Sequence, residues 1–147
     1  MMYEFQNPTD EQVRSYLANS KTIAVVGLSD RDSAVSKRVS KFMQDMGYQI
    51  IPVNPRLADG EILGEKVYAS LADIPLAIDI VNVFRRSEFL PDVAREFVES
   101  DAQVFWAQLD LQSEEAGAIL QAAGRKDVVM NRCIKREYAR LMEGFAS

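Results

Sequence analysis

The chain has 147 residues, of which 48% are hydrophobic and 27% are charged, and its formal net charge is −5. This length fits one domain over residues 1–147, and the acidic balance disfavours a nucleic-acid binder or an anionic-membrane protein. With no histidine and one cysteine, the chain lacks the means for a Cys/His zinc site, a histidine-activated nucleophile or an internal disulfide.

The lack of a recognisable targeting signal and the single cysteine both favour the cytoplasm. No apolar run approaches the roughly 18 residues that a membrane helix needs, and the N-terminal residues show no signal-peptide pattern. A lone thiol suits a reducing compartment. We therefore expect a cytoplasmic protein with no membrane partner.

Short apolar strands alternate with amphipathic helices along the chain. A leading helix within residues 8–19 is predicted from a capping box that joins Thr9 and Gln12, and the core then occupies residues 22–143. Strands are predicted at 22–27, 48–53, 78–84, 104–107 and 127–130. Helices are predicted at 35–46, 91–100, 113–124 and 134–143, with a helical turn at 70–74 and a loop at 58–66. The apolar side of the last helix includes Leu141 and Phe145.

This alternation predicts an α/β, three-layer Rossmann-like fold. Its five-stranded parallel sheet should be covered by helices on both faces. The Rossmann pattern gives the strand order 3-2-1-4-5, with ligands bound at the carboxyl ends of the strands.

The first strand ends in a turn that is typical of a phosphate site. The run TIAVVGLS, residues 22–29, precedes a helix with polar and basic residues near its start. Backbone amides at such a helix N-terminus bind anions. The residues predicted to hold phosphates here are Gly27, Leu28, Ser29, Ser36, Lys37 and Arg38.

Basic residues follow four of the five strands although the whole chain is acidic. Because the carboxyl ends of parallel strands share one edge, the fold should bring these residues together, and arginine is suited to bidentate phosphate contacts. Solvated surface charge is the alternative for each residue taken singly. The candidates after the second, third and fourth strands are Asn54, Pro55 and Arg56, then Phe84, Arg85 and Arg86, then Gln108.

The turn departs from a dinucleotide fingerprint. Ser29 stands where a second glycine is required, and Asn54 stands where an acid would bind the ribose hydroxyls, so NAD is disfavoured. The carboxylates form no general acid–base pair, and we predict no catalytic residue and no metal site. Cys133 is interpreted as a core residue; the alternative is a reactive thiol beside Arg132 and Lys135.

Several motifs in register resemble a known family. The runs IAVVGLS…SKRV, IIPVNP, EILGEKVYASL, DIVNVFRR and VVMNRC-IKREYARL resemble the stand-alone bacterial CoA-binding-domain family over about residues 8–142. That family is similar to the CoA-binding, Rossmann-like domain of the succinyl-CoA synthetase α subunit.

The resemblance implies a role for each motif. Residues 27–29 and Ser36 would hold the CoA phosphates, and Asn54, Pro55 and Arg56 would lie beside the ribose and its 3′-phosphate. Val83, Phe84 and Arg85 would border the adenine, and residues 107–109, which include Gln108, would line the path of the pantetheine arm.

We therefore predict a non-catalytic protein that binds CoA or acyl-CoA, with a protein partner possible but unidentified. An enzyme that uses NAD(P) or another nucleotide is one alternative. A Rossmann-shaped interaction protein that has lost its ligand is the other, because Asp30 and Asp32 add negative charge near the proposed phosphates. Ala34 also stands where the family has a basic residue.

Overall fold

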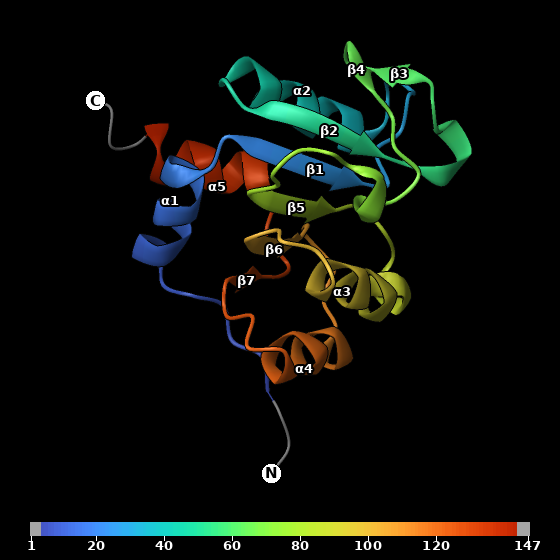
Figure 1. Cartoon of the computed structure of the whole chain (residues 1–147). Coiled ribbons are helices and arrows are strands. Elements are labelled where there is room, and N and C mark those ends of the chain that lie inside the picture. The colour runs from blue at the N-terminus through green and yellow to red at the C-terminus, as the bar shows by residue number, and fades with distance from the viewer. Residues whose placement is uncertain (1–3, 144–147) are drawn as a thin grey trace.

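Five parallel strands form the central sheet of the computed structural model, which describes residues 4–143 (Figure 1). The strands are β1 (Thr22–Val26), β2 (Gln49–Val53), β5 (Ile80–Val83), β6 (Val104–Ala107) and β7 (Val128–Val129). Their positions agree with the prediction to within a few residues at each end. The predicted α/β class, with a parallel sheet covered on both faces, is confirmed.

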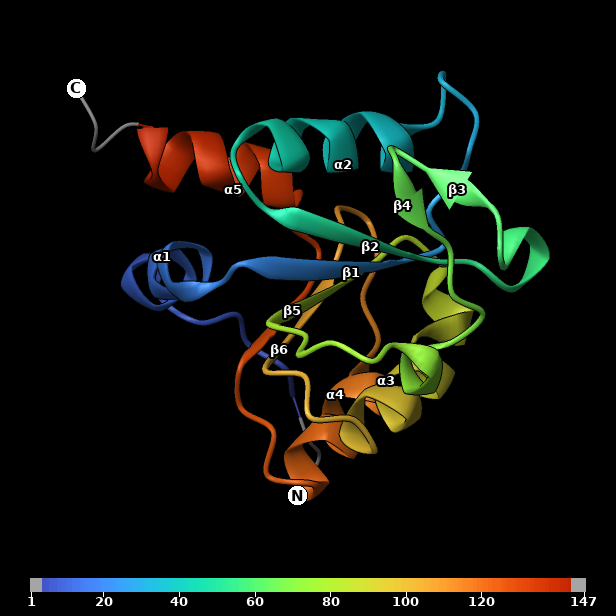
Figure 2. The same cartoon turned by 45° about the horizontal axis from the view of Figure 1, so that its top comes forward.

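The helices divide into two layers, one on each face of the sheet (Figure 2). They are α1 (Asp10–Asn19), α2 (Val35–Asp45), α3 (Leu90–Val98), α4 (Glu114–Ala122) and α5 (Ile134–Leu141). One core cluster joins the sheet to α1, α2 and α5, and the other joins it to α3 and α4. The predicted capping box at Thr9 is present, and Ser113, the first residue of the predicted range 113–124, is the N-cap of α4. Phe145 lies outside the described residues.

The predicted strand order is wrong at one position. The observed order is β2-β1-β5-β6-β7, which is 2-1-3-4-5 when the strands of this sheet are counted along the chain, not 3-2-1-4-5. The third strand therefore pairs with β1 on the side opposite β2. The order reverses between β1 and β5, and such a switch point is where open α/β sheets bind ligands.

Pro52 explains why β2 lies at the edge of the sheet. The carbonyl of Val53 accepts a hydrogen bond from Gly27 N (2.9 Å), so the polar backbone groups of Val53 point toward β1. Those of the preceding residue, Pro52, point outward, and proline has no N–H to donate to a further strand. The backbone N–H of Tyr68 donates to the Pro52 carbonyl instead (2.9 Å).

The segment predicted as a loop at 58–66 contains a small hairpin. Strands β3 (Glu61–Ile62) and β4 (Glu65–Lys66) pair antiparallel around Leu63 and Gly64. Both turn residues have positive φ, 55° and 77°, as in a tight type I′ turn. Leucine rarely occupies such a position, which is why the sequence pattern did not indicate a hairpin.

No helix among residues 4–143 has the length and apolar character needed to cross a membrane. In the same part of the chain, no group of three or more Asp, Glu or Cys side chains is arranged to hold a metal ion.

Because of Tyr48, the free energy of unfolding should fall as the pH rises above 10. Its hydroxyl donates to the Leu17 carbonyl, and burial, helped by the neighbouring Tyr138, raises the pKa of Tyr48 to about 12. In the unfolded chain the tyrosine phenol has a pKa near 10, so above pH 10 the unfolded state loses its proton before the folded state does. The stabilisation from the buried, protonated Tyr48 is therefore complete below pH 10 and is lost as the pH rises to about 12. We expect wild type to lose about 1–2 kcal/mol more than Tyr48→Phe across this window, measured by urea unfolding. Parallel declines in the two proteins would contradict this.

Candidate ligand-binding groove at the carboxyl edge of the sheet

Two adjacent pockets lie above the carboxyl ends of the strands. Pocket A, of about 430 Å³, lies over the ends of β1, β2 and β5, and pocket B, of about 510 Å³, lies over β5, β6 and the start of α5. Phe84, Arg85 and Arg86 line both pockets, so the two pockets adjoin at the tip of β5, and together they are called the groove. Pocket A also includes Gly27, Asn54, Pro55, Arg56, Phe89 and Glu96. Pocket B also includes Val35, Gln108, Leu109, Leu111, Cys133 and Arg136.

Gly27 lies where β1 and β5 end side by side. Its φ is +88°, and a Cβ atom at this position would lie 2.8 Å from the Phe84 carbonyl oxygen and 3.2 Å from Cγ of Arg85. Only glycine allows both this backbone conformation and this close approach. Gly27 therefore lets the β1–α2 turn and the β5 tip meet at the switch point.

Internal hydrogen bonds hold the β1–α2 turn. Ser36 Oγ accepts from Ser29 N (3.1 Å), and the carbonyl of the fully buried Leu28 accepts from Asn54 Nδ2 (3.0 Å). Ala34, the N-cap of α2, provides no side-chain cap, and its carbonyl accepts from the backbone N–H groups of Lys37 and Arg38 (both 3.1 Å). Internal hydrogen bonds thus hold the turn, and the open donors of the α2 N-terminus are the amides of Val35 and Ser36, which precede the first intrahelical donor. Leu28 and Ser36 shape the turn from inside.

The basic residues of α2 lie away from the groove walls. Lys37 Nζ forms an ion pair with Asp32 Oδ1 (2.7 Å) and donates to the Asp30 carbonyl (3.2 Å). This hydrogen bond and charge hold the pKa of Asp32 below its usual value. Arg38 is exposed and, like Lys37, lines neither pocket. Lys37 therefore offsets one of the two aspartates that disfavour an anion here.

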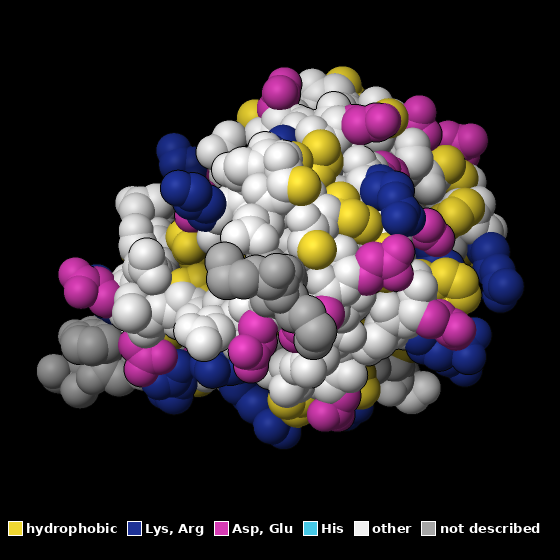
Figure 3. All heavy atoms as spheres, turned by 90° about the horizontal axis from the view of Figure 1, so that it is seen from below, with side chains coloured by type: hydrophobic (Ala, Val, Ile, Leu, Met, Phe, Trp, Pro, Cys, Tyr) yellow, Lys and Arg dark blue, Asp and Glu magenta, His cyan; other side chains and the backbone are white. Residues whose placement is uncertain are grey.

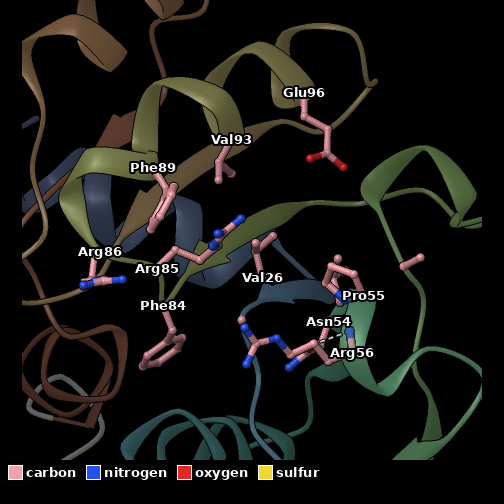
Figure 4. Close-up of a pocket in the computed structure, with 13 residues that line it drawn as sticks. Val26, Asn54, Pro55, Arg56, Phe84, Arg85, Arg86, Phe89, Val93 and Glu96 are labelled. Carbon is pink, nitrogen blue, oxygen red and sulfur yellow. Dashed lines mark hydrogen bonds between the residues drawn. The ribbon is translucent and has the colours of Figure 1, made fainter.

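Three predicted arginines do meet at pocket A (Figure 4). Arg56 comes from the end of β2, where Asn54 Oδ1 accepts from Arg56 N (3.0 Å). Arg85 and Arg86 come from the end of β5, and Figure 4 shows Arg56 and Arg85 facing the same opening from different strands. All three side chains are exposed, but Arg86 Nε lies 3.5 Å from Glu88 Oε1, so a carboxylate competes with an anion at Arg86.

Phe89 and Glu96 are pocket residues that the sequence reasoning missed. The Arg85 guanidinium carbon lies 4.4 Å from the centre of the Phe89 ring and that of Arg86 lies 5.6 Å from it, so Phe89 supports both cations. Glu96 Oε1 accepts from Leu71 N (2.6 Å), which engages its carboxylate. The aromatic residue shortly after the Arg85–Arg86 pair was the available signal for Phe89.

A buried amide pair supports the floor of pocket B. Asn82 Nδ2 donates to Gln108 Oε1 (3.1 Å), which also accepts from Ile134 N (2.9 Å). This joins β5, β6 and the start of α5. Asn82 was missed, although an asparagine within the apolar run Ile80–Val83 was a signal. Val83, which was predicted to border the adenine, is fully buried and packs in the hydrophobic core.

Charge elsewhere on the surface is mixed. Acidic and basic side chains alternate over the face that Figure 3 shows, in keeping with the net charge of −5. The convergence of arginines at pocket A is thus a local feature of an acidic protein. The fold and groove together define a Rossmann-like α/β domain with a site suited to a phosphorylated ligand.

Comparison with known proteins identifies the family. The family model described as a CoA binding domain matches residues 21–139, and the chain belongs to this family. The predicted family resemblance is therefore confirmed.

The relatives include both free-standing proteins and parts of larger enzymes. The uncharacterized protein YneT of Bacillus subtilis is 56% identical over 134 residues, which cover 91% of this chain and 97% of YneT. A Thermus thermophilus protein of known structure superposes with a TM-score of 0.87 at 35% identity, covering 92% of this chain and all of that one. The α subunit of an ADP-forming acetate–CoA ligase of Pyrococcus furiosus is 32% identical over 92 residues, which cover 60% of this chain and 20% of that subunit.

Proposed function

We propose that this protein binds CoA or acyl-CoA in the groove and performs no chemistry on it by itself. The observation that carries the proposal is that Arg56 and Arg85 face pocket A from the ends of β2 and β5, beside the β1–β5 switch point, with Arg86 also lining the pocket. Exposed guanidinium groups gathered at one pocket of an acidic chain favour a ligand with several phosphate oxygens. Membership of the CoA-binding family supports CoA as that ligand.

The ligand's phosphates are assigned to the β1–α2 turn and to the arginines. The α2 N-terminus has open amides and no side-chain cap, so the diphosphate is placed there. The 3′-phosphate is placed at Arg56, and the adenine is placed against Phe84, between the two pockets. These placements follow the family resemblance, and the pocket geometry supports them because Gly27, Arg56 and Phe84 all line pocket A.

A binding role without catalysis is supported by the inventory of the groove. The chain contains no histidine. Of the carboxylates that line the groove, Glu96 of pocket A is engaged by the Leu71 N–H, and Asp110 is the one carboxylate of pocket B. Neither pocket contains a pair that could serve as general acid and general base. We place the protein in the cytoplasm, where its single thiol would stay reduced.

Removing the Arg85 side chain should weaken CoA binding. Arg85→Ala loses one charge-assisted contact, so we expect affinity to fall by about 1–3 kcal/mol, measured by calorimetry. Arg95→Ala is the matched control, because Arg95 is an exposed arginine on α3 that pairs with Asp92 and Glu115 outside both pockets. Equal affinities for wild type and Arg85→Ala would remove the β5 tip from the site.

The same calorimetry separates the alternatives. NAD and ATP are titrated beside CoA and acetyl-CoA. Preferential heat with NAD would favour a nucleotide-dependent enzyme. No heat with any ligand at millimolar concentration would favour an interaction protein that has lost its ligand.

A further inference from the structure

Gln108 is a buried amide whose orientation the fold determines. Its side chain is 4% exposed. Both hydrogen bonds to its side-chain oxygen come from donors, Asn82 Nδ2 and the Ile134 backbone N–H. Exchanging the amide oxygen and nitrogen would set donor against donor at both contacts. The nitrogen Nε2 is therefore the free end of this amide.

Nε2 is a hydrogen-bond donor beside pocket B. Among residues 4–143, the hydrogen bonds of the Gln108 side chain are the two that its oxygen accepts, and the one completely buried side-chain polar atom without a partner is Ser40 Oγ, not Nε2. Nε2 must therefore retain some exposed surface, and the opening that Gln108 lines is pocket B. A buried amide that offers one fixed N–H to an opening is suited to an oxygen acceptor, such as a carbonyl.

The surroundings of this donor are largely apolar. Val35 is 56% exposed and Leu109 is 40% exposed, and both line pocket B. They are two of the four large hydrophobic residues exposed in the described chain. A ligand that carries both a carbonyl and a hydrocarbon chain would suit this arrangement. Its carbonyl would accept from the fixed donor, and its hydrocarbon chain would cover the two apolar side chains.

We propose that pocket B receives the acyl thioester end of acyl-CoA and makes the protein selective for acyl-CoA over free CoA. Gln108 Nε2 donates to the thioester carbonyl, and the acyl chain lies against Val35 and Leu109. Pocket B adjoins pocket A at Phe84, Arg85 and Arg86, which line both pockets, and we infer that a ligand with its nucleotide in pocket A passes this tip to reach pocket B. This inference rests on the proposed function.

The first test compares CoA with butyryl-CoA by calorimetry at about pH 8. Wild type should bind butyryl-CoA about tenfold more tightly, from one hydrogen bond and partial burial of the chain. Gln108→Glu keeps an oxygen for Asn82 and Ile134 but replaces the donor with a carboxylate, so the preference should disappear. Gln121→Glu makes the same charge change in the last turn of α4, outside both pockets, and should keep the preference.

The outcomes distinguish this inference from the proposed function. If wild type binds CoA and butyryl-CoA equally, or if Gln108→Glu weakens both ligands by the same factor, the acyl site is wrong and CoA binding stands. If neither ligand binds, the proposed function fails as well. Urea unfolding of Gln108→Glu verifies that the variant is folded.

A second test uses Cys133, the only cysteine of the chain and a residue of pocket B. Butyryl-CoA should slow maleimide labelling of Cys133 about tenfold at tenfold excess over its dissociation constant. Adenosine 3′,5′-bisphosphate, which lacks the pantetheine arm, should leave the rate unchanged. Equal protection by the two ligands, or none by bound butyryl-CoA, would place the acyl group outside pocket B.

Discussion

Gly27→Ala should lower the free energy of unfolding by about 3 kcal/mol. Gly27 has φ +88°, a backbone conformation that is strained for any residue with a Cβ atom. The added methyl group would also lie 2.8 Å from the Phe84 carbonyl oxygen, which is backbone and cannot rotate away. Relief requires β1 and β5 to separate at their carboxyl ends, so CoA binding should fall together with stability.

Gly124→Ala is the matched control for this prediction. Gly124 has a similar φ of +74°, but a Cβ atom there would meet nothing within 4 Å. This variant should therefore lose only about 1 kcal/mol, from backbone strain alone. Urea unfolding of both variants separates strain from the steric clash. Equal losses would show that the contact with Phe84 is relieved without cost.

Trp106→Ala should have the largest effect on stability, about 4 kcal/mol. Trp106 is fully buried within the cluster beneath α1, α2 and α5. Its Nε1 donates to the Arg132 carbonyl (2.9 Å), and this hydrogen bond fixes the position of the residue that precedes Cys133. Loss of the indole removes core contacts and leaves this segment without its hydrogen bond.

Phe105→Ala separates the two effects of that substitution. Phe105 is the preceding residue of β6, is equally buried and packs in the opposite cluster, so its loss of stability should be similar. Only Trp106→Ala releases Arg132. Maleimide labelling of Cys133 should then be about fivefold faster than in Phe105→Ala. Equal labelling rates would mean that the hydrogen bond does not position Cys133.

Local sequence signals predicted most of the secondary structure because their causes are local. Thr9 and Ser113 cap helices through atoms three residues away, and the apolar run of β6 matches its observed bounds, Val104–Ala107. The Leu63–Gly64 hairpin was missed because the fold holds a leucine at positive φ there. No propensity scale favours that conformation.

The α/β class, the positions of the strands and the basic residues at their tips could all be predicted from the sequence. It also carried the motifs that the family model recognises at residues 21–139. These properties depend on the hydrophobic period and on residue identity, which can be read along the chain.

The strand order and the composition of the groove, in contrast, depend on how the elements pack against one another. The nitrogen of Pro52 faces away from β1 because of the register between β1 and β2, and this direction is what suits β2 to the edge of the sheet. Arg56 and Arg85 meet because β2 and β5 flank β1, whereas Lys37 turns to Asp32. The buried amide of Gln108 takes its orientation from Asn82 and Ile134, which are distant in sequence. Such pairings arise from packing between elements, and no local pattern encodes them.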